Sequence, residues 1–123
     1  LRTRATHLAS GSEIITDAPV DNQGKGEKFS PTDLVASALG SCMLTIMGIT
    51  ANVQNIDIKG TRVKVEKIMG TSPRKIAQIN MEVIFKSPIS NKHKIILERS
   101  AKHCPVAKTL DGNIEENIKF IYP

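Results

Sequence analysis

The sequence predicts an α+β fold, in which one long helix packs against antiparallel strands. No charged side chain occurs between Leu34 and Ile56, and most residues of that stretch are apolar. A segment this long and this apolar must be covered on nearly all sides. Residues 77–85 instead alternate apolar and polar side chains, which indicates a strand with one buried and one wet face. Such a strand suits an antiparallel sheet that is covered by helices on one side only.

The N-terminal part is expected to form a hairpin and a loop. Residues 3–16 contain two short strand-like runs around Ser10 and Gly11, which supply the turn. Residues 17–29 are polar, contain two glycines and show no periodicity. They are too short to link two domains, so we interpret them as a loop that leads into the long helix.

The central helix is predicted over residues 30–53. Ser30 is the expected N-cap, Pro31 fits the first helical position, and Asp33 closes a capping box with Ser30. Small side chains form two rows along this helix, which would let neighbouring backbones approach closely. The rows are Ser37, Ser41 and Thr45, and Ala36 and Gly40. We therefore expect a sheet on one side and another helix, of this chain or of a symmetry mate, on the other. A membrane span fits the length, but the polar residues and the lack of aromatic or basic anchors argue against it.

The C-terminal half is expected to contain three strands and two helical segments. Residues 58–69 and 77–85 are the first two strands, residues 91–102 form a helix with a shorter helical piece after it, and residues 117–122 close with a strand. Three sets of apolar side chains are expected to face inward. They are Ala77, Ile79, Met81, Val83 and Phe85; Ile95, Ile96 and Leu97; and Ile118, Phe120 and Tyr122. Lys92, Lys94 and Glu98 are expected to face outward.

Length and charge narrow the classes of function. A chain of 123 residues is expected to form a single domain, residues 1–123, with one core. The net charge is +5, but the basic residues are scattered and aromatic residues are rare, so we expect no nucleic-acid partner. We find nothing like a signal peptide and no disulfide scaffold, so we expect a cytoplasmic location.

The two cysteines are the candidates for chemistry. Cys104 precedes Pro105, which predicts a helix N-cap where free backbone N–H groups and the helix dipole stabilise a thiolate. Three basic residues add positive charge, namely Lys102, His103 and Lys108. Cys42 lies within the apolar helix, where burial alone would make its thiol inert. Both cysteines could equally be ordinary core residues. The three histidines show no metal-site spacing, so we expect no metal.

Each cysteine lies in a distinctive segment. F-S-P-T-D-L-V-A-S-A-L-G-S-C ends at Cys42, and H-C-P-V-A-K-T-L contains Cys104. Together with T-D-A-P-V-D-N-Q-G-K-G-E-K-F-S-P before the helix, these segments resemble the OsmC/Ohr family, in particular its OsmC-like branch. The resemblance covers nearly the whole chain. It implies an intertwined α+β homodimer with a long buried central helix, a second helical segment and active sites at the subunit interface.

The resemblance also implies a reaction. Members of this family are thiol-dependent peroxidases that reduce organic hydroperoxides, and we expect no cofactor. By position, Cys42 looks like the peroxidatic thiolate that becomes a sulfenic acid, and Cys104 looks like the resolving thiol. An external dithiol would then reopen the disulfide. The residues alone favour Cys104 as the more acidic thiol, whereas the resemblance assigns the first attack to Cys42.

The residues that support the reactive thiol in this family differ here. Peroxidatic members carry a glutamate in the first turn of the helix, and that position appears as Thr32 with Asp33 beside it. The family's arginine is expected from the hairpin, whose turn is A-S-G-S, although Arg2 and Arg4 lie on the preceding strand. The candidate supporting residues are thus Thr32, Asp33, Arg4 and His103. Two functions stay open: a dithiol hydroperoxide reductase, and a non-enzymatic or regulatory module that binds a small ligand.

Overall fold

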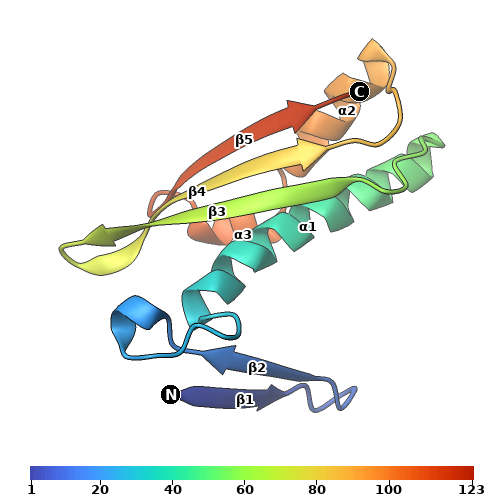
Figure 1. Ribbon diagram of the computed structural model, residues 1–123. Coiled ribbons are helices and arrows are strands. Elements are labelled where there is room, and N and C mark those ends of the chain that lie inside the picture. Colours follow the sequence, from blue (N-terminus) through green and yellow to red (C-terminus); the bar gives the residue numbers. More distant parts are fainter. The chain divides into compact units, whose positions relative to one another are not determined.

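The computed structural model describes residues 1–123 (Figure 1). The chain divides into two compact units, Leu1–Val35 and Ala36–Pro123. Helices and strands occur together without a repeated β-α-β pattern, which confirms the predicted α+β class. The assignment of residues 1–123 to a single domain stays a prediction.

The first unit contains the predicted hairpin. Strands β1 (Arg2–Thr6) and β2 (Glu13–Asp17) pair antiparallel. Gly11 closes the turn with a positive φ of 80°, a conformation that glycine adopts without strain, and its N–H donates to the carbonyl of His7 at 2.7 Å. After β2 comes a short 3-10 helix, η1 (Val20–Asn22), within the predicted loop.

A buried carboxylate ties the hairpin to this loop. One oxygen of Asp17 accepts the backbone N–H of Glu27 at 3.0 Å and contacts Nη2 of Arg2 at 3.3 Å. The Glu27 N–H is the main cause that lowers the pKa of Asp17, and the guanidinium of Arg2 lowers it further. Sequence patterning did not reveal this link, because the partners are ten and fifteen positions from Asp17.

Helix α1 (Pro31–Gln54) begins where the capping signals predict. The hydroxyl of Ser30 accepts the N–H of Asp33 at 3.0 Å, and the carboxylate of Asp33 accepts the N–H of Ser30 at 2.9 Å. This reciprocal pair is a capping box. It fixes the first turn of α1 within the first unit.

The second unit contains a three-stranded sheet in the order β3-β4-β5. β3 pairs antiparallel with β4 as predicted, whereas β5 pairs parallel with β4, so the sheet is mixed. Two helices separate β4 from β5, and such a long crossover is what a parallel pair requires. The elements are β3 (Arg62–Thr71), β4 (Arg74–Ile84), α2 (Asn91–Ala101), α3 (Pro105–Leu110) and β5 (Glu115–Ile121).

One side of α1 forms the core with the inner face of this sheet. Leu39, Met43 and Met47 are fully buried. They belong to two hydrophobic clusters that also contain buried side chains of β4 and the residue after it. These are Ile76, Ile79, Met81, Val83 and Phe85. α1 is long and apolar enough to cross a membrane by length and composition alone, but the core helix of a soluble protein passes the same test.

The opposite side of α1 is uncovered in the protomer. Its exposed residues recur at helical spacing and carry no charge; they are Ala38, Ser41, Thr45, Ile49, Asn52 and Val53. The side chains of Ile49 and Val53 are 56% and 74% exposed. The sequence predicted that α1 is covered on nearly all sides, but the protomer itself covers only one side of the helix.

Strand β4 departs from the predicted alternation at one point. Ala77 was expected to face inward, but Ile76 is buried instead. The register shifts here, because Gln78 pairs with Ile68 whereas Ile76 pairs with Met69. Ala77 is the extra residue of a bulge, so the side chains before it change face.

Helix α2 buries only one of its three consecutive apolar residues. Leu97 is fully buried, whereas Ile95 is 61% exposed and Ile96 is half-buried. The inward prediction is confirmed for Leu97 and wrong for Ile95, because successive helical residues point about 100° apart. Ser90 caps the helix by accepting the N–H of His93 at 3.2 Å.

The C-terminal Tyr122 is fixed between α2 and the sheet. Its ring stacks on Phe85 with centroids 4.7 Å apart, and Nζ of Lys94 lies 4.4 Å from its centroid. Its hydroxyl donates to Glu98 at 2.6 Å. Burial and, second, this carboxylate raise the pKa of Tyr122. Lys94 and Glu98 were expected to face outward, but both are half-buried around this ring.

Candidate thiol site

The two cysteines come from different elements of the second unit. Cys42 lies on α1 and is half-buried, whereas Cys104 is fully buried at the start of α3. Cys104 is the N-cap of α3, as predicted, with Pro105 at the first helical position. Its Sγ accepts the N–H of Ala107 at 3.2 Å.

The fold brings these two thiols together. Cys42 packs against the core cluster that contains Cys104, and its thiol lies within hydrogen-bonding range of the Cys104 thiol. Both are free thiols. Residues 62 positions apart in the sequence are thus close enough to interact directly.

The electrostatics of Cys104 differ from the sequence-based expectation. Burial is the largest effect and raises the pKa of its thiol, and the neighbouring Cys42 raises it further. The N–H of Ala107 acts in the opposite direction but does not prevail. The expectation that the helix cap lowers the pKa of Cys104 is therefore not met, although the cap itself is present. Desolvation opposes the charged thiolate more strongly than the N–H groups of Ala107 and Val106 support it.

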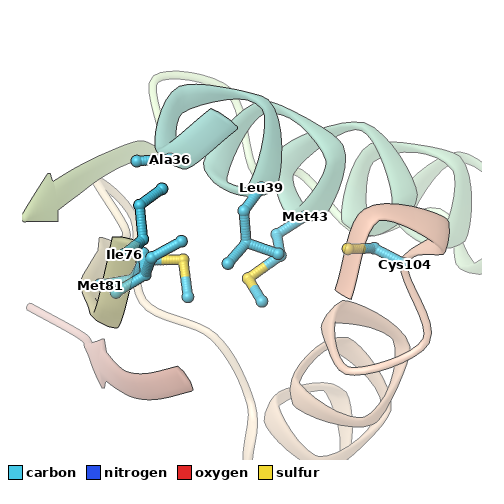
Figure 2. Close-up of a cluster of buried hydrophobic side chains, with 7 residues drawn as sticks. Ala36, Leu39, Met43, Ile76, Met81 and Cys104 are labelled. Carbon is cyan, nitrogen blue, oxygen red and sulfur yellow. The ribbon is translucent and has the colours of Figure 1, made fainter. Parts of the chain in front are cut away.

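The Cys104 thiol belongs to an apolar cluster (Figure 2). Met43 of α1 is drawn on the side of the cluster nearer to Cys104, Leu39 lies beyond it, and Met81 and Ile76 of β4 continue the same cluster. The buried members of this cluster include no titratable side chain besides Cys104. These side chains are themselves buried, so they shield Cys104 from water.

The predicted supporting residues have partners of their own. Asp33 is engaged in the capping box, and Thr32 Oγ1 lies 3.2 Å from the hydroxyl of Ser30. Nε of Arg4 lies 3.7 Å from a carboxylate oxygen of Glu13. Thr32, Asp33 and Arg4 belong to the first unit, Leu1–Val35.

His103, the fourth predicted supporting residue, is exposed. Its backbone N–H donates to the carbonyl of Ser100 at 3.0 Å. Its role, like those of the other three residues, stays a prediction. No three His, Cys, Asp or Glu side chains in residues 1–123 are arranged to hold a metal ion.

Two contributors to the site were missed in the sequence. The N–H of Ala107 is the specific donor to Cys104, and the position three residues after an N-cap is the signal that identifies it. Met43 was taken only as part of an apolar helix, although it follows Cys42 directly and packs in the cluster with Cys104. No pattern in one sequence distinguishes a core methionine from one beside a reactive thiol.

The family of the chain follows from its similarity to known proteins. The family model for OsmC-like proteins matches residues 24–119. The match spans the capping box, both cysteines and most of the sheet. The chain belongs to the OsmC-like protein family, as the resemblance predicted.

Individual relatives agree with this assignment. An uncharacterized protein of Methanocaldococcus jannaschii is 34% identical over 101 residues, which are 77% of this chain and 53% of that protein. The chain thus spans about half the length of that curated relative. A crystal structure from Psychrobacter arcticus, provisionally assigned to osmotic stress induction and detoxification response, has 49% identity and a TM-score of 0.93 over 98% of this chain and 88% of that chain.

A more distant structure shares the fold. It is an organic hydroperoxide resistance protein from Legionella pneumophila with 15% identity and a TM-score of 0.77, covering 98% of this chain and 95% of that chain. At this identity the similarity establishes the α+β architecture alone.

Proposed function

We propose that the protein reduces organic hydroperoxides and uses Cys42 and Cys104 as its redox pair. The observation that carries this proposal is the proximity of the two thiols, which lie within hydrogen-bonding range of each other, one half-buried and the other fully buried. A disulfide needs Cα atoms within ~7 Å and side chains that point toward each other, and two thiols already this close are well placed to form one. Family membership and the hydroperoxide resistance of a fold relative support the same chemistry.

The reaction balances with these two sulfurs. The Cys42 thiolate attacks the terminal peroxide oxygen, the O–O bond breaks, and the alkoxide takes up a proton and leaves as an alcohol. Cys42 is then a sulfenic acid. The Cys104 sulfur attacks the Cys42 sulfur, the S–O bond breaks, and water leaves with the proton of Cys104. An external dithiol supplies two electrons and two protons to restore both thiols.

Accessibility supports Cys42 as the first nucleophile. Cys42 is partly exposed, whereas Cys104 has no exposed surface. The raised pKa of Cys104 keeps that thiol protonated at neutral pH, and a thiol is a far weaker nucleophile than a thiolate. The buried sulfur therefore suits the second step, in which it meets a sulfenic acid already beside it.

Partly exposed apolar side chains near the thiols support an organic peroxide as the substrate. Ile46 and Val106 pack against the cluster that contains Cys104 and keep part of their surface accessible, so they can offer dispersion contacts to an alkyl or aryl group. Hydrogen peroxide has no such group to gain from them.

We also propose that the working form is a homodimer. The uncharged stripe on α1 leaves Ile49 and Val53 exposed, and a second copy of this helix would cover them. A two-stranded hairpin with open edges is at best marginally stable alone, and every residue of β1 is exposed. Both features suit an intertwined pair of chains, and Cys42 borders the stripe on α1.

Thiol counting after peroxide treatment tests the redox proposal. The fully reduced protein should lose two free thiols on adding one equivalent of cumene hydroperoxide, and a dithiol should restore them. The Cys104→Ser variant should accumulate a sulfenic acid that a dimedone probe detects at Cys42. The matched Cys42→Ser variant should keep its single thiol.

Two outcomes would contradict this assignment. An unchanged thiol count in the folded protein would favour the non-enzymatic, ligand-binding alternative. Sulfenic acid at Cys104 in the Cys42→Ser variant, without any at Cys42 in the reciprocal variant, would reverse the two roles.

A further inference from the structure

The positive charge of the chain is concentrated next to the thiol site. Residues 91–110 contain five lysines or arginines and one glutamate, which gives +4 of the net charge of +5. The single acid, Glu98, accepts the hydroxyl of Tyr122 and is half-buried. The exposed charged side chains of this segment are thus all cations.

Four exposed residues of this segment share one side of α2. They lie at the spacing i, i+3, i+7 and i+10, and we call them the α2 basic face: Lys92, Ile95, Arg99 and Lys102. None of the three cations forms an ion pair within the chain. Lys94, which is held over the ring of Tyr122, is not part of this face.

The α2 basic face ends beside the thiols. Lys102 is the C-cap of α2, and Cys104 follows two residues later. A cavity of about 590 Å³ is lined by Lys102 together with Met43 and Ala107, the latter being the donor to Cys104. A molecule bound on α2 can therefore extend toward the residues that surround Cys104.

The charges divide this region into two parts. Besides Lys102 and Lys108, the cavity is lined by Asp111 and Glu116, and burial together with Asp111 raises the pKa of Glu116. An acidic segment would be repelled from these carboxylates and attracted to the α2 basic face. An uncharged group meets no such repulsion and is free to enter the cavity.

The presence of Ile95 favours a protein over a nucleic acid. Its side chain is 61% exposed among the cations of the face, and protein interfaces combine an apolar centre with a charged rim. A nucleic acid would use the cations but gain little from an isoleucine, and no aromatic side chain lies on this face for base stacking.

We propose that the α2 basic face docks an acidic protein that carries the dithiol reductant. The proposal rests on the proposed function, because it assigns the partner that reopens the Cys42–Cys104 disulfide. One thiolate of the partner attacks a sulfur of that disulfide, and the S–S bond breaks. The second thiol of the partner then attacks the partner's own sulfur in the mixed disulfide, and the cysteine of this chain leaves as a thiol. The partner loses two electrons and two protons and leaves as a disulfide, while both cysteines become thiols.

Two synthetic dithiol peptides test the docking step. Both contain the same C-x-x-C core, and one is flanked by four glutamates and the other by four glutamines. The rate at which each reopens the oxidised protein is measured by thiol release. We expect the glutamate peptide to be about tenfold faster at low salt, an advantage that should vanish near ~0.5 M salt.

Charge reversals locate the effect. In the Lys92→Glu/Arg99→Glu variant, the ratio of the two peptide rates should fall to about one. The Lys59→Glu/Lys75→Glu variant loses the same charge at exposed positions outside α2 and should keep the ratio. Uncharged dithiothreitol reports whether the disulfide itself is intact in each variant.

Three results would overturn the docking proposal. They are equal rates for both peptides in the unchanged protein, loss of the ratio in the control variant, and displacement of the glutamate peptide by equimolar single-stranded RNA. Failure of the proposed function has a different signature, since cumene hydroperoxide would then form no disulfide. In that case diamide can oxidise the pair, and the peptide comparison still decides whether α2 selects acidic dithiols.

Discussion

At the scale of single residues, Cys104 illustrates a competition between two local effects. A cap position offers an N–H group to the sulfur, and burial removes the water that would solvate a thiolate. Both effects are present, and burial is the larger. The sequence reveals the cap through Cys104 and Pro105, but burial depends on Met43 and Met81, which lie on other elements.

The pH dependence of Cys104 follows from this balance. In the Cys42→Ser variant, alkylation of Cys104 should have a midpoint above that of an ordinary cysteine thiol, because burial, the largest cause of its raised pKa, persists without Cys42. The unfolded protein in urea should titrate near ~8.5. Because the pKa of Cys104 is raised in the folded protein, its buried thiol contributes fully to the free energy of unfolding below the unfolded pKa. This contribution is lost as the pH rises through the folded pKa. A folded midpoint below that of the unfolded protein would mean that the cap outweighs burial.

At the scale of elements, the close approach of α1 to β3 depends on a missing side chain. A Cβ on Gly40 would lie 2.7 Å from Cγ2 of Val65 and 3.1 Å from Cγ1 of Val63. Valine is β-branched and cannot swing its methyl groups away freely. The small row of Ala36 and Gly40 predicted a close backbone neighbour, whereas at Gly40 the structure shows the side chains of two valines of β3.

Two glycines of the same helix should therefore respond oppositely to alanine. Gly40→Ala should lower the free energy of unfolding by about 1–3 kcal/mol, the usual cost of overpacking. Gly48→Ala should raise it by up to about 1 kcal/mol, because nothing lies within 4 Å of its Cβ position and alanine favours a helix. Urea denaturation measures both values.

Relief of the clash provides the control for Gly40. The double variant Gly40→Ala/Val65→Ala should be less destabilised than the sum of its single changes, since Val65 supplies the nearest atom. Additive effects, or a gain in stability from Gly40→Ala alone, would show that the close packing of α1 on β3 does not limit this position.

Elements could be predicted from the sequence where a local signal exists. The capping box at Ser30 and Asp33 fixed the start of α1, and alternation located β4. The bulge at Ala77 could not be predicted, because it arises from pairing with β3. The parallel placement of β5 was equally hidden, since strand direction depends on how α2 and α3 return the chain.

At the scale of the whole molecule, the pairing of the two cysteines was predicted from the family resemblance, and not from the charges or the spacing of residues. The resemblance placed Cys42 and Cys104 together, and the structure brings them within hydrogen-bonding range. The roles of Thr32, Asp33 and Arg4 stay predictions. The structure shows only that each of these residues is engaged by a partner within residues 1–35.

The homodimer can be tested through the uncharged stripe on α1. Ile49→Lys should place an ammonium group in the proposed helix–helix contact, where an unpaired buried charge is strongly unfavourable. The variant should therefore be a monomer at concentrations where the unchanged protein is a dimer. Sedimentation velocity over a dilution series measures the difference.

An isoleucine of similar exposure supplies the matched control. Ile95 on α2 is 61% exposed and Ile49 on α1 is 56% exposed, so both changes replace an exposed isoleucine by lysine on a helix. Ile95→Lys should leave the oligomeric state unchanged, because α2 is not part of the stripe. If Cys42 borders the contact as proposed, Ile49→Lys should also slow the loss of thiols to cumene hydroperoxide. A monomeric unchanged protein, or a dimer that persists in Ile49→Lys, would leave the stripe without its proposed partner and refute the helix–helix contact.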